Sequence, residues 1–189
     1  GAPTMRDSAR GNDSQRYSGY SLDHYIAAKL HIPSPVGVER IERSTLVQKL
    51  VESPGVPLVL ISAPAGYGKS TLLAQWSSHR RYMSGTEHAR ERPFAAVTLA
   101  SSDNDPAVFW SCIARSVQRA CPDVRLELLL TGRQPNTDNL LPGLIEEIVT
   151  NCPHIVLALD NYQAITEPEC HAQIEHLLNR LPLQARLVL

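Results

Sequence analysis

Short apolar runs alternate with amphipathic stretches along most of the chain. Each apolar run is only a few residues long and is bounded by turn residues, which predicts a strand buried in a sheet. The four predicted strands are Leu58–Ser62, Phe94–Leu99, Ile155–Leu159 and the closing run ARLVL. A strand–helix alternation of this kind predicts an α/β fold, with a parallel sheet covered by helices on both faces.

The amphipathic stretches between these runs predict helices. Asp105 followed by Pro106 predicts a helix start, with the aspartate as cap and the proline at the first helical position. Phe109, Ile113 and Val117 then repeat every four residues and form an inward stripe. Ser44 is the expected N-cap of an earlier short helix. Further helices are expected at Lys69–Arg80, at Glu169–Arg180 and around Leu140, Leu141, Leu144, Ile145 and Ile148.

The organisation along the chain follows from these patterns. Residues 1–28 are rich in Ser, Gly, Arg, Asp and Asn, and we expect a disordered tail there. Within it, residues 1–4 precede Met5 and are interpreted as vector-derived. Residues 29–189 are expected to form the N-terminal part of a domain, truncated after its fourth core strand, because the sequence stops inside an apolar run.

Charge and hydropathy exclude some classes of partner. The formal net charge of −1 gives no bulk electrostatic attraction to nucleic acid or anionic lipid. The basic cluster His79-Arg80-Arg81, with Arg90 and Arg92, is interleaved with glutamates, which favours a solvated loop over a phosphate-contacting surface. No apolar run is long enough to cross a membrane, and no signal-peptide core is present.

The four cysteines are scattered without a Cys-x-x-Cys pair. This spacing is typical neither of a disulfide-dense secreted domain nor of a zinc module, so the expected compartment is the reducing cytoplasm. Cys170, His171 and His176 form one local group of possible metal ligands. The two imidazoles are five residues apart, which does not place them on one helix face, so a solvated helix surface is the preferred interpretation.

The turn between the first strand and the next helix has the form of a phosphate-binding loop. The pattern G-x-x-x-x-G-K-[ST] is met with alanine in place of the first glycine. Its positions are Ala63, Pro64, Ala65, Gly66, Tyr67, Gly68, Lys69 and Ser70, with Thr71 following. Backbone amides of the loop would bind the β-phosphate at the helix N-terminus, Lys69 would contact the β- and γ-phosphates, and Ser70 would ligate Mg²⁺.

A second acidic element supports this interpretation. The run HIVLALDN is an apolar strand that ends in Asp160. An aspartate at this position holds the magnesium ion in P-loop NTPases. The alternative is an aspartate that only caps a turn. Together the two elements predict a site for ATP or ADP with Mg²⁺, on a three-layer P-loop NTPase fold.

Four segments occur in the order typical of a known family. KLHIPSP, LVLISAPAGYGKSTLLAQW, DNDPAVFW and LALDNYQAI resemble the large ATP-binding LuxR-type transcriptional regulators, which belong to the signal-transduction ATPases with numerous domains. The resemblance covers residues 29–189. It implies that the last strand lies between the P-loop strand and the strand of Asp160, and that the P-loop strand is left as an apolar edge prone to self-association.

The resemblance also implies a switch. Members of the family rest with bound nucleotide, respond to a ligand or a regulatory protein, self-associate with ATP and bind DNA through a C-terminal domain that is absent here. In the family the segment before the P-loop helps to hold the adenine, and Val38, Ile41 and Arg43 fall in that segment here. For Arg43 the open alternative is a surface arginine.

Two departures from the family pattern bear on catalysis. A second acid usually follows the magnesium-binding aspartate, whereas this chain has Asn161. An amide cannot accept the proton of the attacking water, so ATP hydrolysis is expected to be slow or absent. The strand before DNDP usually ends in an acid, whereas this chain has Ala100. Two other functions remain open: a P-loop kinase or other metabolic ATPase, and a nucleotide-free interaction scaffold.

Overall fold

A four-stranded parallel sheet lies at the centre of the molecule. The computed structural model describes residues 25–30, 43–52, 55–64, 66–82, 92–130 and 137–189. The strands are β1 (Leu58–Val59), β2 (Phe94–Thr98), β3 (Val156–Asp160) and β4 (Arg186–Val188), in the order β1-β4-β3-β2. The terminal strand β4 therefore separates β1 from β3, as expected, and all three of its residues are buried.

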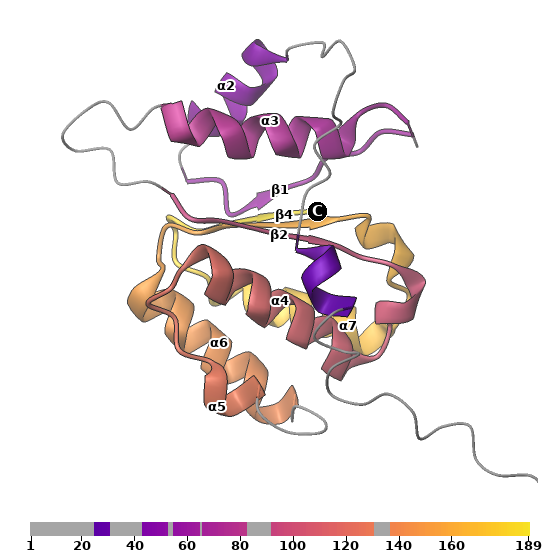
Figure 1. Ribbon diagram of the computed structural model, residues 1–189, viewed down its shortest axis with the longest axis vertical. Coiled ribbons are helices and arrows are strands. Elements are labelled where there is room, and N and C mark those ends of the chain that lie inside the picture. The colour runs from indigo at the N-terminus through magenta and orange to yellow at the C-terminus, as the bar shows by residue number, and fades with distance from the viewer. Residues whose placement is uncertain (1–24, 31–42, 53–54, 65, 83–91, 131–136) are drawn as a thin grey trace, which may run out of the picture.

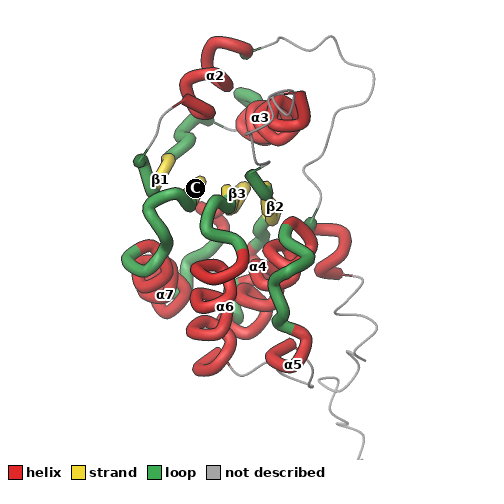
Figure 2. The backbone as a smooth tube through the Cα atoms, turned by 90° about the vertical axis from the view of Figure 1, so that its left-hand side faces the viewer, coloured by secondary structure: helices red, strands yellow, loops and turns green. Residues whose placement is uncertain are grey.

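Helices cover both faces of this sheet (Figure 1). One face carries α2 (Ser44–Glu52) and α3 (Lys69–Tyr82). The other carries α4 (Pro106–Ala120), α6 (Thr137–Asn151) and α7 (Pro168–Leu178), with the short α5 (Glu127–Leu130) against α6. The end-on view in Figure 2 shows the same three layers. The prediction of a three-layer α/β fold is confirmed.

The predicted stripes form the core of the larger layer. Phe109, Ile113 and Val117 of α4 are fully buried, and the five apolar residues predicted for α6 are also buried. Asp105 caps α4 as predicted, since its Oδ1 accepts hydrogen bonds from the backbone N–H groups of Ala107 and Val108. The spacing of apolar residues was sufficient to predict α4, because its buried face and its N-cap indicate the same helix.

Two element boundaries differ from the sequence prediction. Strand β1 covers only Leu58 and Val59, and Leu60 is 68% exposed, so the predicted strand to Ser62 was too long. One further backbone hydrogen bond, from Ile61 N–H to the carbonyl of Leu189 at 2.8 Å, continues beyond it. Helix α2 begins at Ser44, and the carbonyl of Arg43 accepts the first helical hydrogen bonds from the next turn. Arg43, not Ser44, is therefore the residue at the N-cap.

The segment before the predicted domain boundary is partly ordered. Residues 25–29 are helical and Ile26 is 1% exposed, so residues 25–28 do not belong to a disordered tail. The fully buried carboxylate of Asp103 accepts hydrogen bonds from Tyr25 Oη at 2.8 Å and from Lys29 Nζ. Residues 1–24 lie outside the described part of the chain.

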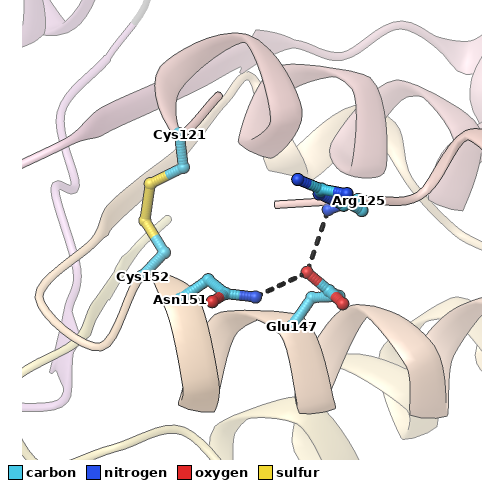
Figure 3. Close-up of a disulfide and its surroundings, with 5 residues drawn as sticks. All are labelled: Cys121, Arg125, Glu147, Asn151 and Cys152. Carbon is cyan, nitrogen blue, oxygen red and sulfur yellow. Dashed lines mark hydrogen bonds between the residues drawn. A yellow bond between two sulfur atoms is a disulfide. The ribbon is translucent and has the colours of Figure 1, made fainter. Parts of the chain in front are cut away.

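A disulfide joins Cys121 to Cys152, which the cysteine spacing did not predict (Figure 3). Cys121 follows α4 and Cys152 follows α6, so the bond ties together the C-terminal ends of two helices in the larger layer. Beside it, Glu147 accepts hydrogen bonds from the backbone of Arg125 and from Asn151. Two cysteines 31 residues apart in sequence meet because α4 and α6 pack on the same face of the sheet.

Candidate functional site

The candidate phosphate loop connects β1 to α3, which is the strand–loop–helix context that its chemistry requires. Gly66 has φ +83° and Gly68 has φ +80°, a backbone region that residues with a side chain rarely adopt. The carbonyl of Gly68 accepts the hydrogen bond from Leu72 N at 2.9 Å that opens α3. Ala65 lies outside the described residues.

Lys69 lies over its own loop. Its Nζ donates hydrogen bonds to the carbonyl oxygens of Ala63 and Pro64, at the start of the loop. The ammonium group is therefore held on the loop side of the α3 N-terminus, where a phosphate oxygen would be a stronger acceptor than a neutral carbonyl.

Ser70 and Asp160 meet across 90 residues of sequence. Ser70 lies in the first turn of α3 and Asp160 at the last position of β3, and Ser70 Oγ donates to Asp160 Oδ2 at 2.6 Å. Asp160 is 9% exposed. The structure thus brings together the two side chains that the sequence nominated as magnesium ligands.

This donor set fits magnesium. Mg²⁺ keeps several water ligands and is commonly held by one or two protein oxygens together with substrate phosphates. Ser70 and Asp160 supply a hydroxyl and a carboxylate at hydrogen-bonding distance, next to a loop suited to phosphate. Among the described residues no group of three or more His, Cys, Asp or Glu side chains could hold a metal ion. His171 and His176 are exposed on α7 but Cys170 is buried, so the predicted solvated surface does not include the cysteine.

Arg43 also reaches the loop. Its Nη2 donates to the carbonyl oxygen of Tyr67 at 2.9 Å, and its backbone N–H donates to Gln75 Oε1 at 3.2 Å. The family resemblance associates Val38, Ile41 and Arg43 with the adenine. Val38 and Ile41 lie outside the described residues, and Arg43 contacts the phosphate loop.

Asn161 adopts the left-handed conformation, with φ 61° and ψ 33°. Asparagine tolerates this region better than most residues. Its Nδ2 donates to the carbonyl of Leu99 at 2.8 Å, and its Oδ1 accepts from Gln163 Nε2 at 2.6 Å. The side chain therefore ties the end of β3 to the residue that follows β2.

A second asparagine, which sequence reasoning missed, fastens the same edge of the sheet. Asn104 Oδ1 accepts from the backbone N–H groups of Thr166 and Glu167, and its Nδ2 donates to the carbonyl of Ala164. Asn104 follows Asp103 in the DNDP segment. Through Asn104 this segment hydrogen-bonds the loop after β3 and so connects it to the loop after β2. The sequence signal for this role was an asparagine directly before the N-cap residue of α4, because asparagine side chains commonly hydrogen-bond nearby backbone groups.

The two free cysteines are not candidates for nucleophilic chemistry. Burial raises the pKa of the Cys112 thiol to about 12, and burial together with the charges of Glu167, Glu169 and Asp105 raises that of Cys170 to about 11. Both thiols therefore stay protonated at neutral pH and lack the thiolate that reactivity requires.

The fold and the site define a P-loop domain, and comparison with known proteins gives the family. Residues 55–188 match the family model described as an AAA domain, and the chain belongs to this family. The HTH-type transcriptional regulator MalT of Cronobacter sakazakii is 29% identical over 158 residues, which cover 82% of this chain and 16% of that protein. This relationship confirms the resemblance to ATP-binding LuxR-type regulators.

Two further similarities broaden the comparison. The serine/threonine-protein kinase PknK of Mycobacterium tuberculosis is 29% identical over 157 residues, covering 81% of this chain and 13% of the kinase. The solved structure of the Drosophila ORC bound to DNA aligns with 99% of this chain and 47% of its own, at a TM-score of 0.50 and 13% identity, and shows the shared fold. The chain thus spans under a fifth of the length of the curated relatives it matches. No helix in the described part is long and apolar enough to cross a bilayer.

Proposed function

We propose that this domain binds Mg-ATP and Mg-ADP and serves as the nucleotide switch of a multidomain signal-transduction regulator. The observation that carries the proposal is the 2.6 Å hydrogen bond between Ser70 Oγ and Asp160 Oδ2. It places a helix-start hydroxyl and a strand-end carboxylate beside a glycine loop and a lysine. This is the set of groups that a nucleoside triphosphate and its magnesium require.

Each group has a distinct part in the proposed binding. The loop from Ala63 to Thr71 supplies backbone amides at the N-terminus of α3, where the helix dipole favours a phosphate. Lys69 exchanges the carbonyls of Ala63 and Pro64 for phosphate oxygens, and Ser70 and Asp160 hold the magnesium ion. Bound magnesium would screen the negative charge of the phosphates.

The same site is expected to hydrolyse ATP slowly. A general base beside the attacking water commonly contributes a factor of about 10²–10⁴ in rate. Asn161 occupies the position where relatives of this kind carry an acid, and its side chain is engaged with Leu99 and Gln163. A long-lived ATP state suits a switch, since the signal lasts as long as the nucleotide.

The wider role rests on the relatives. MalT is named as a helix-turn-helix transcriptional regulator, and the similarity to it covers most of this chain. We infer a regulator in which this domain controls self-association or binding of a regulatory protein, while DNA is bound by another part of the molecule.

Thermal unfolding with and without nucleotide tests the proposal. A ligand at 100 times its Kd stabilises the folded state by about 2.7 kcal/mol. For a chain of this size that corresponds to a rise in Tm of roughly 5–10 °C. We expect such a rise with Mg-ATP and with Mg-ADP.

The Lys69→Ala variant distinguishes a phosphate site from general binding. It should keep the Tm of the nucleotide-free protein and lose most of the nucleotide-induced rise, because it removes one charge partner of the phosphates. Lys49→Ala on α2 is the control with the same change in charge. Equal nucleotide affinity of Lys69→Ala and wild type by calorimetry would refute the assignment of the loop, and no shift in wild type would favour the interaction scaffold.

A further inference from the structure

Arg43 is the connection between helix α2 and the phosphate loop. Its Nη2 donates to the carbonyl oxygen of Tyr67 at 2.9 Å. A Cβ atom placed on Gly68 would lie 3.2 Å from the same Nη2, so the guanidinium lies directly against the backbone of the loop. Gly68 is thus constrained twice, by its positive φ and by this close approach.

This contact determines the direction of a loop amide. The carbonyl of Tyr67 and the N–H of Gly68 belong to one trans peptide plane, in which the two groups point in opposite directions. Because Arg43 holds the carbonyl on the α2 side, the N–H of Gly68 points away from α2. That amide is one of the proposed phosphate donors.

Gln75 of α3 in turn holds Arg43 in place. Its Oε1 accepts the hydrogen bond from the backbone N–H of Arg43 at 3.2 Å. This N–H lies at the N-cap of α2, where backbone donors have no partner within the helix. The side chain of Gln75 therefore fixes the start of α2 against α3, six residues beyond Lys69.

The other end of α2 is fixed independently. Arg186, which is 2% exposed on strand β4, donates from Nη1 to the carbonyl oxygen of Leu50. Between the two ends, Val47 is buried in the cluster that contains Leu72 and Trp76 of α3. Helix α2 is therefore contacted at both ends, and Arg43 projects from its start toward the loop.

We propose that Gln75 is a positioning residue for nucleotide binding, acting through Arg43 on the Tyr67–Gly68 peptide. The inference rests on the proposed nucleotide site. A loop with two glycines in left-handed backbone has many accessible conformations, and ordering it on binding lowers affinity. The bonds from Gln75 to Arg43 and from Arg43 to Tyr67 order the loop in advance, and any partner that displaced α2 would weaken nucleotide binding.

A double-mutant cycle measures this coupling. Calorimetric titration of the 189-residue chain with Mg-ADP is carried out on wild type, Arg43→Met, Gln75→Leu and the double variant. We expect Arg43→Met to bind roughly 10- to 30-fold more weakly and Gln75→Leu about 3- to 10-fold more weakly. The double variant should match Arg43→Met within about twofold, because Gln75 acts only through Arg43.

Two further variants separate positioning from packing. Gln75→Glu keeps an acceptor for the Arg43 N–H and should restore affinity to within about threefold of wild type, a rescue that a purely steric role does not predict. Gln48→Ala is the matched control, a glutamine on α2 that bonds Glu52 of the same helix, and should bind as wild type does. Gln75→Asn, too short to reach, replaces Gln75→Leu if the latter does not fold.

The outcomes distinguish this inference from the function on which it rests. If wild type binds Mg-ADP and Lys69→Ala does not, yet Arg43→Met and Gln75→Leu bind normally, positioning by Gln75 is wrong while the nucleotide site stands. Independent, multiplying losses in the double variant would also overturn it. Absence of Mg-ADP binding by wild type would remove both.

Discussion

The two faces of the sheet are held in different ways. The face with α4, α6 and α7 carries a large apolar cluster that includes Phe109, Trp110 and Leu144, together with the Cys121–Cys152 disulfide. The face with α2 and α3 has a much smaller cluster and depends on polar contacts at its edges, such as that of Arg186 with Leu50. The candidate site lies on the side that is packed less extensively.

The difference in apolar packing suits the two layers to different roles. A large core gives a fixed platform for the ends of β2 and β3, where Asp160 must stay in place. The smaller layer, attached through a glycine loop and few apolar contacts, has a lower free-energy cost of local rearrangement. A nucleotide switch needs both properties, and the following predictions test whether they are divided in this way.

The largest expected effect is a cavity in the larger layer. Phe109→Ala removes a fully buried aromatic ring from α4 and should lower the free energy of unfolding by about 3–5 kcal/mol. Leu73→Ala, in the smaller cluster on α3, is the comparison and should cost about 2 kcal/mol, at the lower end of the range for such truncations. Urea denaturation followed by circular dichroism measures both. Equal losses would mean that the two layers contribute alike.

The disulfide should contribute nearly as much to the free energy of unfolding as the Phe109 side chain does. Cys121 and Cys152 close a loop of 31 residues, for which the loss of unfolded-state entropy is worth about 3–4 kcal/mol. We expect the Cys121→Ala/Cys152→Ala double variant, or wild type in reductant, to unfold at lower urea concentration. Affinity for Mg-ADP should not change, because the bond lies at the strand ends opposite the phosphate loop.

Thiol counting provides the control for this prediction. Unfolded without reductant, the chain should present two reactive thiols, those of Cys112 and Cys170, and four after reduction. Four thiols without reductant would show that the disulfide is absent from the protein.

A smaller loss is expected where the N-terminal helical segment docks. Asp103→Asn keeps the shape of a fully buried side chain but replaces one acceptor oxygen by a donor, next to Lys29 and the backbone N–H of Ala100. It should cost about 1–3 kcal/mol. Asp123→Asn, an exposed aspartate after α4, is the control and should be neutral.

The pH dependence sharpens this prediction. Burial alone would lower the pKa of Lys29, but its hydrogen bonds to Asp103 and Tyr25 and the charge of Asp103 outweigh burial, so the pKa is raised. A raised pKa stabilises the folded state below the pKa of an unfolded lysine, about 10.4, and this stabilisation is lost as pH rises through the higher folded value. The gap between wild type and Asp103→Asn should therefore be constant from pH 7 to 9 and shrink at higher pH.

Sequence reasoning succeeded where local signals and packing coincide. The cap at Asp105, the stripe of Phe109 and Ile113, and the strand ending in Asp160 each follow from residue spacing, and the structure agrees with all three. The meeting of Ser70 with Asp160 could be expected as well, because carboxyl ends of parallel strands share one edge of the sheet.

The features that were missed depend on long-range contact. Cys121 and Cys152 meet only because α4 and α6 end side by side, and Lys29 reaches Asp103 across 74 residues. Neither pairing leaves a periodic trace in the sequence. The predicted length of β1 was wrong for a related reason. The apolar Leu60 indicates a strand whether or not a neighbouring strand pairs with it.

The smallest expected effect concerns Asn161, which follows β3 next to Asp160. Asn161→Asp places a carboxylate one residue beyond Asp160, where a general base could act on the attacking water. An aspartate also tolerates φ 61°, but it cannot donate to the carbonyl of Leu99, so the side chain would turn from its present partner. We therefore expect the rate of single-turnover ATP hydrolysis to rise by roughly tenfold, below the usual range of about 10²–10⁴ for a positioned base.

The control is Asn161→Ala, which removes the same hydrogen bond without adding a base and should give no gain in rate. If wild type already hydrolyses ATP as fast as relatives that carry the acid, and Asn161→Asp changes nothing, another residue positions the water and the role assigned to this position is wrong.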